Sequence, residues 1–184
     1  LSLNIVIAGG TGKVGNLLGS MLDEKNHKTS VLCRNAFLAS APARVSGDFG
    51  WLGEGYLRKH PSVQLRDWDG GDMLDIVGCD FLGWQDDTLK KADVVVNLVG
   101  GYTNQRTMAC ERIVRESLRV NPSAKHILLS LDDVDLVTTL KKDRAKECEE
   151  LLTANCSDSI CFRRESGDVK GACANIMKVI DETC

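Results

Sequence analysis

The chain has 184 residues, of which 43% are hydrophobic and 27% charged, the balance of one globular domain with a sizeable core. The formal net charge of −3 argues against intrinsic disorder, which needs few apolar residues and a large net charge. It also argues against a dedicated nucleic-acid binder, which carries a strong basic excess. No apolar run approaches the ~20 residues that a membrane-spanning helix needs.

Apolar periodicity along the chain predicts strands that alternate with helices. Strands are expected at residues 4–8, 29–33, 63–68, 92–99, 125–131 and 159–162. Helices are expected from the first glycine-rich turn to residue 22, and then at residues 105–120, 137–154 and 171–182. The intervening segments 36–62 and 70–87 have no clear periodicity and are expected to be irregular, the first as an insertion.

This alternation is typical of an α/β protein with a doubly wound parallel sheet and helices on both faces, a Rossmann-like single domain. The sequence predicts that this domain spans residues 1–166 and that a C-terminal helix follows in residues 167–184. The chain starts at Leu1 and enters its first strand almost at once, with no visible signal segment. Because an unprocessed cytosolic protein begins with Met, this start favours a processed organelle protein or a trimmed chain.

Cysteine spacing carries no metal or disulfide signature. The chain has eight cysteines and three histidines, with no C-x-x-C pair and no zinc-finger spacing. Free and mostly buried thiols in a reducing compartment are therefore expected, and no metal site. Cys156 and Cys161 are close enough in sequence to pair only if the chain between them turns back.

The most informative feature is a glycine-rich turn between the first strand and the first helix. The pattern Gly9-x-x-Gly12-x-x-Gly15 provides a tight turn, a close backbone approach to a pyrophosphate, and close helix–strand packing. An anion would lie at the helix N-terminus, where free N–H groups and the helix dipole favour negative charge. We expect a dinucleotide-binding site made of Gly9, Gly10, Thr11, Gly12, Lys13, Val14 and Gly15.

The end of the second strand bears on which dinucleotide is preferred. An acidic residue there would bind both ribose hydroxyls of NAD, but this chain has Arg34 followed by Asn35. A guanidinium at this place suits the 2′-phosphate of NADP, and Lys13 adds a second positive charge. NADP(H) is therefore favoured over NAD. The alternatives are that Arg34 is a solvated surface arginine and that cofactor binding has been lost.

Four short stretches, GGTGKVG, VLCRN, RDWD and ADVVVNLVGG, occur in this order and resemble the short-chain dehydrogenase/reductase superfamily. They look closest to its extended and atypical branches, the sugar-nucleotide epimerase-like and NmrA-like proteins, and the resemblance covers residues 3–164. It implies that Asp69 lies near the adenine ring. It also implies that Leu98, Val99 and Gly100 lie beneath the adenosine ribose and the nicotinamide side.

The chain departs from this superfamily where the superfamily's chemistry is concentrated, in a Tyr and a Lys four residues apart on one helix. Lys146 matches the lysine, but Lys142 stands at the tyrosine position, and neither Tyr56 nor Tyr102 precedes a lysine by four. Ser130 lies near the strand-end hydroxyl of the superfamily. Without a phenol to donate a proton, roughly 10²–10⁴ in rate is lost. Lys146 and Ser130 are therefore only weak catalytic candidates, and the chain leans toward being no enzyme.

A second departure is that only 18 residues follow Ser166, enough for one helix but not for the superfamily's substrate-binding region. The first hypothesis is accordingly a non-catalytic auxiliary subunit or assembly factor of an organellar complex, photosynthetic or respiratory, as known for atypical members of the superfamily. The alternatives are an NADP-dependent reductase or epimerase with unusual acid/base residues, with Lys142 or Asp132 as acid, and an NADPH-sensing regulator.

The first hypothesis implies a larger protein complex as partner, peripheral association with a membrane complex, and no nucleic acid. It favours the chloroplast stroma over the mitochondrial matrix, with the cytoplasm left open. Arg112, Arg115 and Arg119 share one helix face that could dock an acidic partner. The alternative is a solvated face with local pairing to Glu111 and Glu116, which helical spacing favours.

Overall fold

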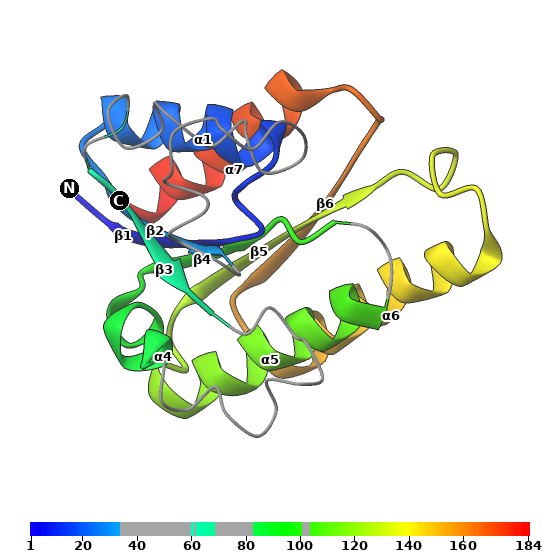
Figure 1. Ribbon diagram of the computed structural model, residues 1–184, viewed down its shortest axis with the longest axis horizontal. Helices are drawn as coiled ribbons and strands as arrows, with labels where there is room; N and C mark the ends of the chain where they lie inside the picture. The colour runs from blue at the N-terminus through cyan, green and yellow to red at the C-terminus, as the bar shows by residue number, and fades with distance from the viewer. Residues whose placement is uncertain (34–59, 61, 69–82, 101–103) are drawn as a thin grey trace.

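The computed structural model describes residues 1–33, 60, 62–68, 83–100 and 104–184 of the chain. Within them six strands form one sheet in the order β3-β2-β1-β4-β5-β6, with every neighbouring pair parallel (Figure 1). The strands are β1 (Asn4–Ala8), β2 (Lys28–Cys33), β3 (Val63–Asp67), β4 (Val94–Asn97), β5 (Lys125–Leu131) and β6 (Ser159–Arg164). The strand order reverses between β1 and β4, which is the point where Rossmann-like sheets bind ligands. The predicted fold class is confirmed.

Helices cover both faces of this sheet, as Figure 1 shows. One face carries α1 and α7, and the other carries α4, α5 and α6. The helices are α1 (Lys13–Glu24), α4 (Trp84–Asp87), α5 (Asn104–Val120), α6 (Thr139–Asn155) and α7 (Val169–Thr183), with a 3₁₀ turn η4 (Leu89–Lys91) after α4.

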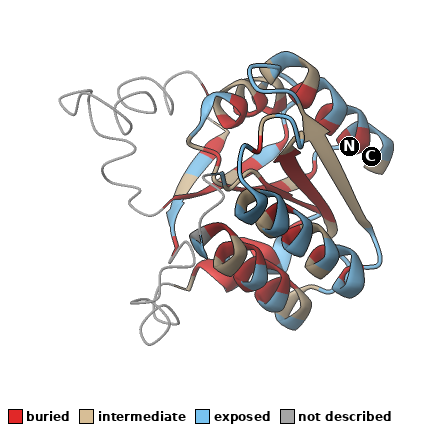
Figure 2. Cartoon of the chain, turned by 90° about the vertical axis from the view of Figure 1, so that its right-hand side faces the viewer, coloured by how far each residue is buried: buried red, intermediate tan, exposed pale blue. Residues whose placement is uncertain are grey.

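Both faces of β1 are buried, which explains its uninterrupted apolar sequence. Ile5 and Ile7 belong to the hydrophobic core beneath α1 and α7. Val6 and Ala8 belong to a second core on the opposite face, shared with Trp84 near the start of α4. Figure 2 shows the buried residues concentrated along the sheet and on the inward sides of the helices.

The C-terminal helix α7 joins the core of the sheet domain. Its side chain stripe of Cys173, Ile176, Met177 and Ile180 is buried in the same core as α1. Asp168 caps the helix by accepting a hydrogen bond of 2.9 Å from the N–H of Gly171. The predicted helix at residues 171–182 is therefore observed, one turn longer in total.

Two strands, β4 and β6, end two residues away from their predicted ends. β4 is shorter than the expected 92–99, because the N–H of Val99 turns to the Asn97 side chain at 3.0 Å and leaves the ladder. β6 is longer than the expected 159–162, because Arg163 and Arg164 continue its pairing with Ser130 and Leu131 of β5. The extension matters for the site, since it brings Arg164 to the carboxyl edge of the sheet.

The segment 70–87 was expected to be irregular, and this is wrong for its last four residues, which form α4. A single helical turn is too short to show hydrophobic periodicity. It begins after Gly83, whose φ of 64° lies in the left-handed region that favours glycine. The helix buries Trp84, whose ring meets that of Trp68 edge to face with centroids 5.5 Å apart.

The cysteines that the structure describes are all free, as predicted, and most are buried. Cys156 and Cys161 form no disulfide with each other. Burial raises the pKa of the Cys33 thiol to about 12, so this thiol stays protonated at neutral pH. Cys79 lies outside the described residues.

On α5, two of the arginines of the predicted docking face are paired locally. Glu116 accepts hydrogen bonds from Arg119 at 2.8 Å and from Arg115 at 3.4 Å. Burial alone would raise the pKa of Glu116, but the hydrogen bond and charge of Arg119 outweigh it and hold this pKa below its usual range.

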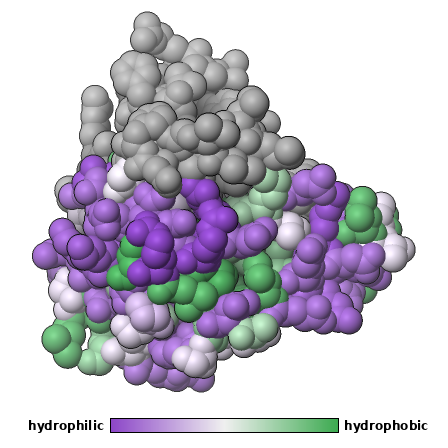
Figure 3. Space-filling view, turned by 90° about the horizontal axis from the view of Figure 1, so that it is seen from below, coloured by the Kyte–Doolittle hydropathy of each residue, from purple (hydrophilic) through white to green (hydrophobic). Residues whose placement is uncertain are grey.

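Seen from the α5 and α6 side, the surface is mainly hydrophilic with separate hydrophobic patches (Figure 3). Among the described residues, no helix combines the length and apolar character needed to cross a membrane.

Stability is expected to fall as the medium becomes mildly acidic, because of buried histidines. Burial lowers the pKa of His126 to about 4, although the charge of Asp158 acts to raise it, and burial also lowers the pKa of His27. The unfolded chain therefore takes up these protons near pH ~6.5 while the folded chain does not. Above that pH the two histidines do not lower the free energy of unfolding. As the pH falls toward their pKa in the folded chain, the free energy of unfolding decreases by about 1.4 kcal/mol per pH unit for each histidine that is protonated only in the unfolded chain.

Urea unfolding at about pH 7.5 and about pH 5 measures this dependence. His126→Asn should show a smaller loss between the two conditions than the parent protein. Its amide can still pair with the Ser117 hydroxyl, which lies 3.0 Å from Nε2 of His126. An equal loss in both proteins would mean that His126 is not responsible.

Candidate functional site

The glycine turn links the end of β1 to the start of α1 and runs against the segment after β4. Gly9 has a φ of 70°, which side chains rarely adopt. A Cβ at Gly9 would also lie 2.7 Å from backbone atoms of Val99. The close approach of the two backbones therefore requires glycine at this position.

Gly12 and Gly15 serve different purposes in the same turn. A Cβ on Gly15 would overlap the carbonyl group of Gly10, so the third glycine lets α1 pack against the turn. Among the described residues, a Cβ on Gly12 would meet no atom within 4 Å beyond its chain neighbours, and Gly12 lines a cavity. The protein itself therefore does not need glycine at position 12, and a side chain there would fill space that is open to a ligand.

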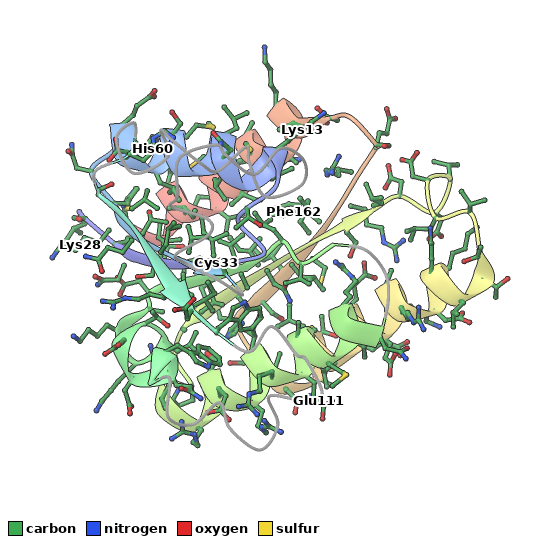
Figure 4. The ribbon with its side chains drawn as sticks, viewed as in Figure 1. Lys13, Lys28, Cys33, His60, Glu111 and Phe162 are labelled. Carbon is green, nitrogen blue, oxygen red and sulfur yellow. The ribbon has the colours of Figure 1, made fainter. Side chains whose placement is uncertain are left out.

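The amino end of α1 carries positive charge at this cavity. The helix begins at Lys13, has no side-chain cap on Gly12 and has no acidic residue in its first turn. Figure 4 shows Lys13 at this end of the helix, at the carboxyl edge of the sheet. The helix dipole and the lysine together favour an anion here.

The cavity itself has a volume of about 620 Å³ and lies across the carboxyl ends of β1, β4, β5 and β6. Its lining comprises Gly9, Gly12, Lys13, Val14, Gly15, Leu98, Gly100, Arg106, Leu129, Ser130, Leu131, Lys141, Arg164, Ser166, Gly167 and Val169. Within this described lining, lysine and arginine supply all the charged side chains, and there is no aspartate or glutamate. The cavity is therefore suited to an anionic ligand.

Arg106 ties two strand ends together at the floor of the cavity. It lies in the first turn of α5 and is only 2% exposed. Its guanidinium donates hydrogen bonds to the Val99 carbonyl, to the Leu129 carbonyl at 3.2 Å and to Ser130 Oγ at 2.8 Å. These bonds hold the Ser130 hydroxyl in place at the cavity surface and join the chain after β4 to β5.

A pair of buried thiols, Cys110 of α5 and Cys148 of α6, lies close to the backbone of Arg106. Cys110 and Cys148 are hydrogen-bonded, which lowers the pKa of Cys148 to about 7 and raises that of Cys110. Both are at most 1% exposed and neither lines the cavity. They connect α5 to α6 and are not presented to a ligand. Among the described residues, no cluster of histidine, cysteine or carboxylate side chains could hold a metal ion.

Most of the residues predicted to bind a dinucleotide or to act as weak catalytic candidates lie together at this cavity. Those that line it are Gly9, Gly12, Lys13, Val14, Gly15, Leu98, Gly100 and Ser130. Gly10, Thr11 and Val99 do not line it. Gly10 instead faces Ile7 and Val31 in the core, and Val99 contributes its carbonyl to Arg106.

Lys146 does not line the cavity. Its side chain is 72% exposed and pairs with Glu150 at 3.5 Å on the outer face of α6. Lys142, at the superfamily's tyrosine position, is exposed too, whereas its neighbour Lys141 lines the cavity. Arg34, Asn35 and Asp69 lie outside the described residues, and so do Tyr56 and Tyr102.

Three charged lining residues were not identified from the sequence, namely Arg106, Lys141 and Arg164. They come from α5, α6 and β6, so no local motif contains them. The available signal was position, because Arg164 lies two residues beyond the end of the predicted strand 159–162 and ligands bind beyond the carboxyl ends of such strands.

No protein-family model matches the sequence, and no curated protein matches it. Solved structures do resemble its fold. The Bordetella bronchiseptica enzyme WbmH in complex with NAD⁺ matches 98% of this chain over 73% of its own, with 13% identity and a TM-score of 0.68. Yeast methylglyoxal/isovaleraldehyde reductase Gre2 with NADPH matches 88% of this chain over 52% of its own, with 14% identity and a TM-score of 0.58.

A mutant of NmrA matches 88% of this chain over 45% of its own, with 13% identity and a TM-score of 0.60. This chain thus spans about half the length of NmrA and Gre2 and almost three quarters of WbmH. Identities this low show a shared fold and nothing more. The chain therefore has the Rossmann-like fold of these proteins, the fold of the short-chain dehydrogenase/reductase superfamily that its sequence motifs resemble.

Proposed function

We propose that this chain binds NADP(H), with the pyrophosphate at the glycine turn. The observation that carries the proposal is the open space at Gly12, at the amino end of α1, in a cavity whose described lining holds lysine and arginine but no carboxylate. Such a place suits phosphate groups, because backbone N–H groups and the helix dipole attract negative charge. WbmH and Gre2, which share the fold, were crystallised with NAD⁺ and NADPH.

The residues around the cavity fit such a ligand. Gly12 allows the phosphates to approach the backbone, and Lys13 adds positive charge beside them. Leu98 and Gly100 provide a surface without charge for the ribose and the ring next to it. Bound NADP(H) would supply hydride chemistry. Ser130 accepts a hydrogen bond from Arg106, so its own O–H remains able to donate to a ligand.

A second proposal is that the chain has a non-catalytic role, as an auxiliary subunit or assembly factor of an organellar complex. The exposed position of Lys146, away from the cavity and paired with Glu150, favours this role over the proton transfer of the superfamily. The proposed compartment is the chloroplast stroma ahead of the mitochondrial matrix, and this choice rests on the sequence resemblance alone. Copurification with a large complex, together with NADPH binding but no turnover, would support it.

Calorimetric titration with NADPH and NADH tests the first proposal. We expect a dissociation constant for NADPH on the order of micromolar, and weaker binding of NADH.

Lys13→Gln should weaken NADPH binding by about tenfold, since it removes the charge beside the phosphates. Arg34→Gln should reduce the preference for NADPH over NADH. Lys178→Gln, an exposed change on α7, serves as the control. Absence of NADPH binding at millimolar concentration would refute the proposal.

A further inference from the structure

The positive charges around the cavity are not balanced by the protein. Among the described residues, Lys13, Lys141 and Arg164 form no ion pair. Arg163, directly before Arg164, makes the contrast clear. Its guanidinium is held by Glu149 at 2.9 Å and by Asp133, whereas Arg164 donates to a backbone carbonyl.

Carboxylates are present near the cavity, but other groups use them. Asp133 pairs with Arg163 at 2.6 Å. Asp135 accepts a hydrogen bond from the N–H of Ser166 at 2.6 Å, and Asp168 caps α7. Asp133, Asp135 and Asp168 are therefore engaged with the frame of the site, and no acidic residue of these two connections is part of the described cavity lining.

The pyrophosphate of a dinucleotide would not balance these charges by itself. It carries about two negative charges, one on each phosphate, against the three cations Lys13, Lys141 and Arg164. The 2′-phosphate of NADP(H) is expected at Arg34, after the second strand. Lys13 lies with the phosphate-binding turn, on α1. Lys141 lies on α6, which covers the opposite face of the sheet (Figure 1). A pyrophosphate at the glycine turn therefore gives no reason for the presence of Lys141 at the cavity.

The surroundings of Lys141 are suited to an oxyanion. Ser130 lies near the carboxyl end of β5, a strand that contacts α6, and it lines the same cavity as Lys141 while being 2% exposed. Its Oγ is fixed by Arg106 at 2.8 Å, so the hydroxyl can donate to a ligand from a defined position. A lysine and a fixed hydroxyl together provide charge and a directed hydrogen bond, which is what a carboxylate or a phosphate binds.

We propose that the side of the cavity lined by Ser130 and Lys141 binds the carboxylate or phosphate group of a small anionic ligand, while the dinucleotide occupies the glycine turn. The proposal rests on the proposed function, because it assigns the rest of the cavity to NADP(H). It names the substrate class of the site: small anionic carbonyl or hydroxyl compounds rather than neutral ones.

Paired probes that differ in charge test this assignment. Pyruvate and its methyl ester form one pair, and dihydroxyacetone phosphate and dihydroxyacetone form the other. Calorimetry is carried out on the protein alone and on the protein saturated with NADPH. We expect at least one charged probe to bind the NADPH complex about tenfold or more tightly than its neutral partner. The pair that shows this difference identifies carboxylate or phosphate as the preferred group.

Two lysine variants separate this proposal from the proposed function. Lys141→Gln should weaken the charged probe by about tenfold and change NADPH binding less than twofold. Lys13→Gln should show the reverse pattern, and Lys141→Arg should restore most of the probe affinity. Lys178→Gln should change neither. The NADPH titration of the parent protein is read by itself, so failure of the proposed function is seen there first.

Three results would overturn the inference. The first is equal or absent binding of charged and neutral probes in both pairs. The second is competition between probe and NADPH. The third is a Lys141→Gln protein that loses NADPH affinity as much as probe affinity, since Lys141 would then serve the dinucleotide's own phosphates. A thermal unfolding curve for each variant confirms that it is folded before binding is compared.

Discussion

Gly12→Val is expected to weaken NADPH binding by about 100-fold or more, which corresponds to about 2.7 kcal/mol. The reason is that the valine side chain would occupy the open space through which phosphates reach the amino end of α1. The protein alone should tolerate the change, because Gly12 has an extended backbone and, in the part of the chain that the structure describes, its added Cβ meets no atom within 4 Å beyond its chain neighbours. The free energy of unfolding should fall by only about 1 kcal/mol, the cost of a poor residue at a helix N-cap.

Gly15→Ala is the matched contrast in the same turn. Its added carbon would overlap the backbone of Gly10, so the turn must shift. We expect the free energy of unfolding to fall by roughly 3 kcal/mol. Urea unfolding and NADPH calorimetry on both variants give the comparison. A Gly12→Val protein that binds NADPH as tightly as the parent would rule out phosphates at the turn.

Arg106→Met is expected to cost roughly 4 kcal/mol in the free energy of unfolding. The substitution keeps an unbranched side chain but removes hydrogen bonds to the carbonyls of Val99 and Leu129 and to Ser130. At 2% exposure for Arg106, water cannot readily replace these donors. The two carbonyls would be left poorly satisfied at the ends of β4 and β5, and the sheet would be weakened where the cavity lies.

Arg106→Lys provides the control, since it keeps the charge but offers a point donor in place of a planar fork. It should recover part of the lost stability and not all of it. Urea unfolding of the parent and both variants measures the effect. If Arg106→Met were as stable as the parent, the tie between the strand ends would be energetically unimportant.

The central strands β1, β4 and β5 were predictable because they are buried on both faces. The segments 4–8 and 125–131 contain the apolar runs 5–8 and 127–129 beside polar residues, and β1 and β5 have the predicted bounds. The ends of β4 and β6 were less predictable. They depend on tertiary contacts, such as the Asn97 side chain that takes the N–H of Val99 and the pairing of Arg164 with Leu131. Neither contact leaves a periodic signal in the sequence.

The candidate site likewise has residues that were predictable from the sequence and residues that were not. Gly9, Gly12 and Gly15 could be identified because the chemistry of a phosphate-binding turn is local and needs glycine at fixed spacing. Lys141 and Arg164 could not, because register and helix packing bring them together from distant parts of the chain. The resemblance to the superfamily pointed to Lys146, yet the structure presents Lys141, five residues earlier on the same helix, to the cavity.

The unbalanced charge at the cavity also bears on kinetics. Lys13, Lys141 and Arg164 concentrate positive potential at one opening of a protein whose net charge is −3. Such a field draws anions toward the opening and raises their rate of encounter. Its reach is about 8 Å at physiological ionic strength, so added salt should slow arrival far more than departure. The cavity would then discriminate among metabolites partly by how fast they arrive, before any contact within it is made.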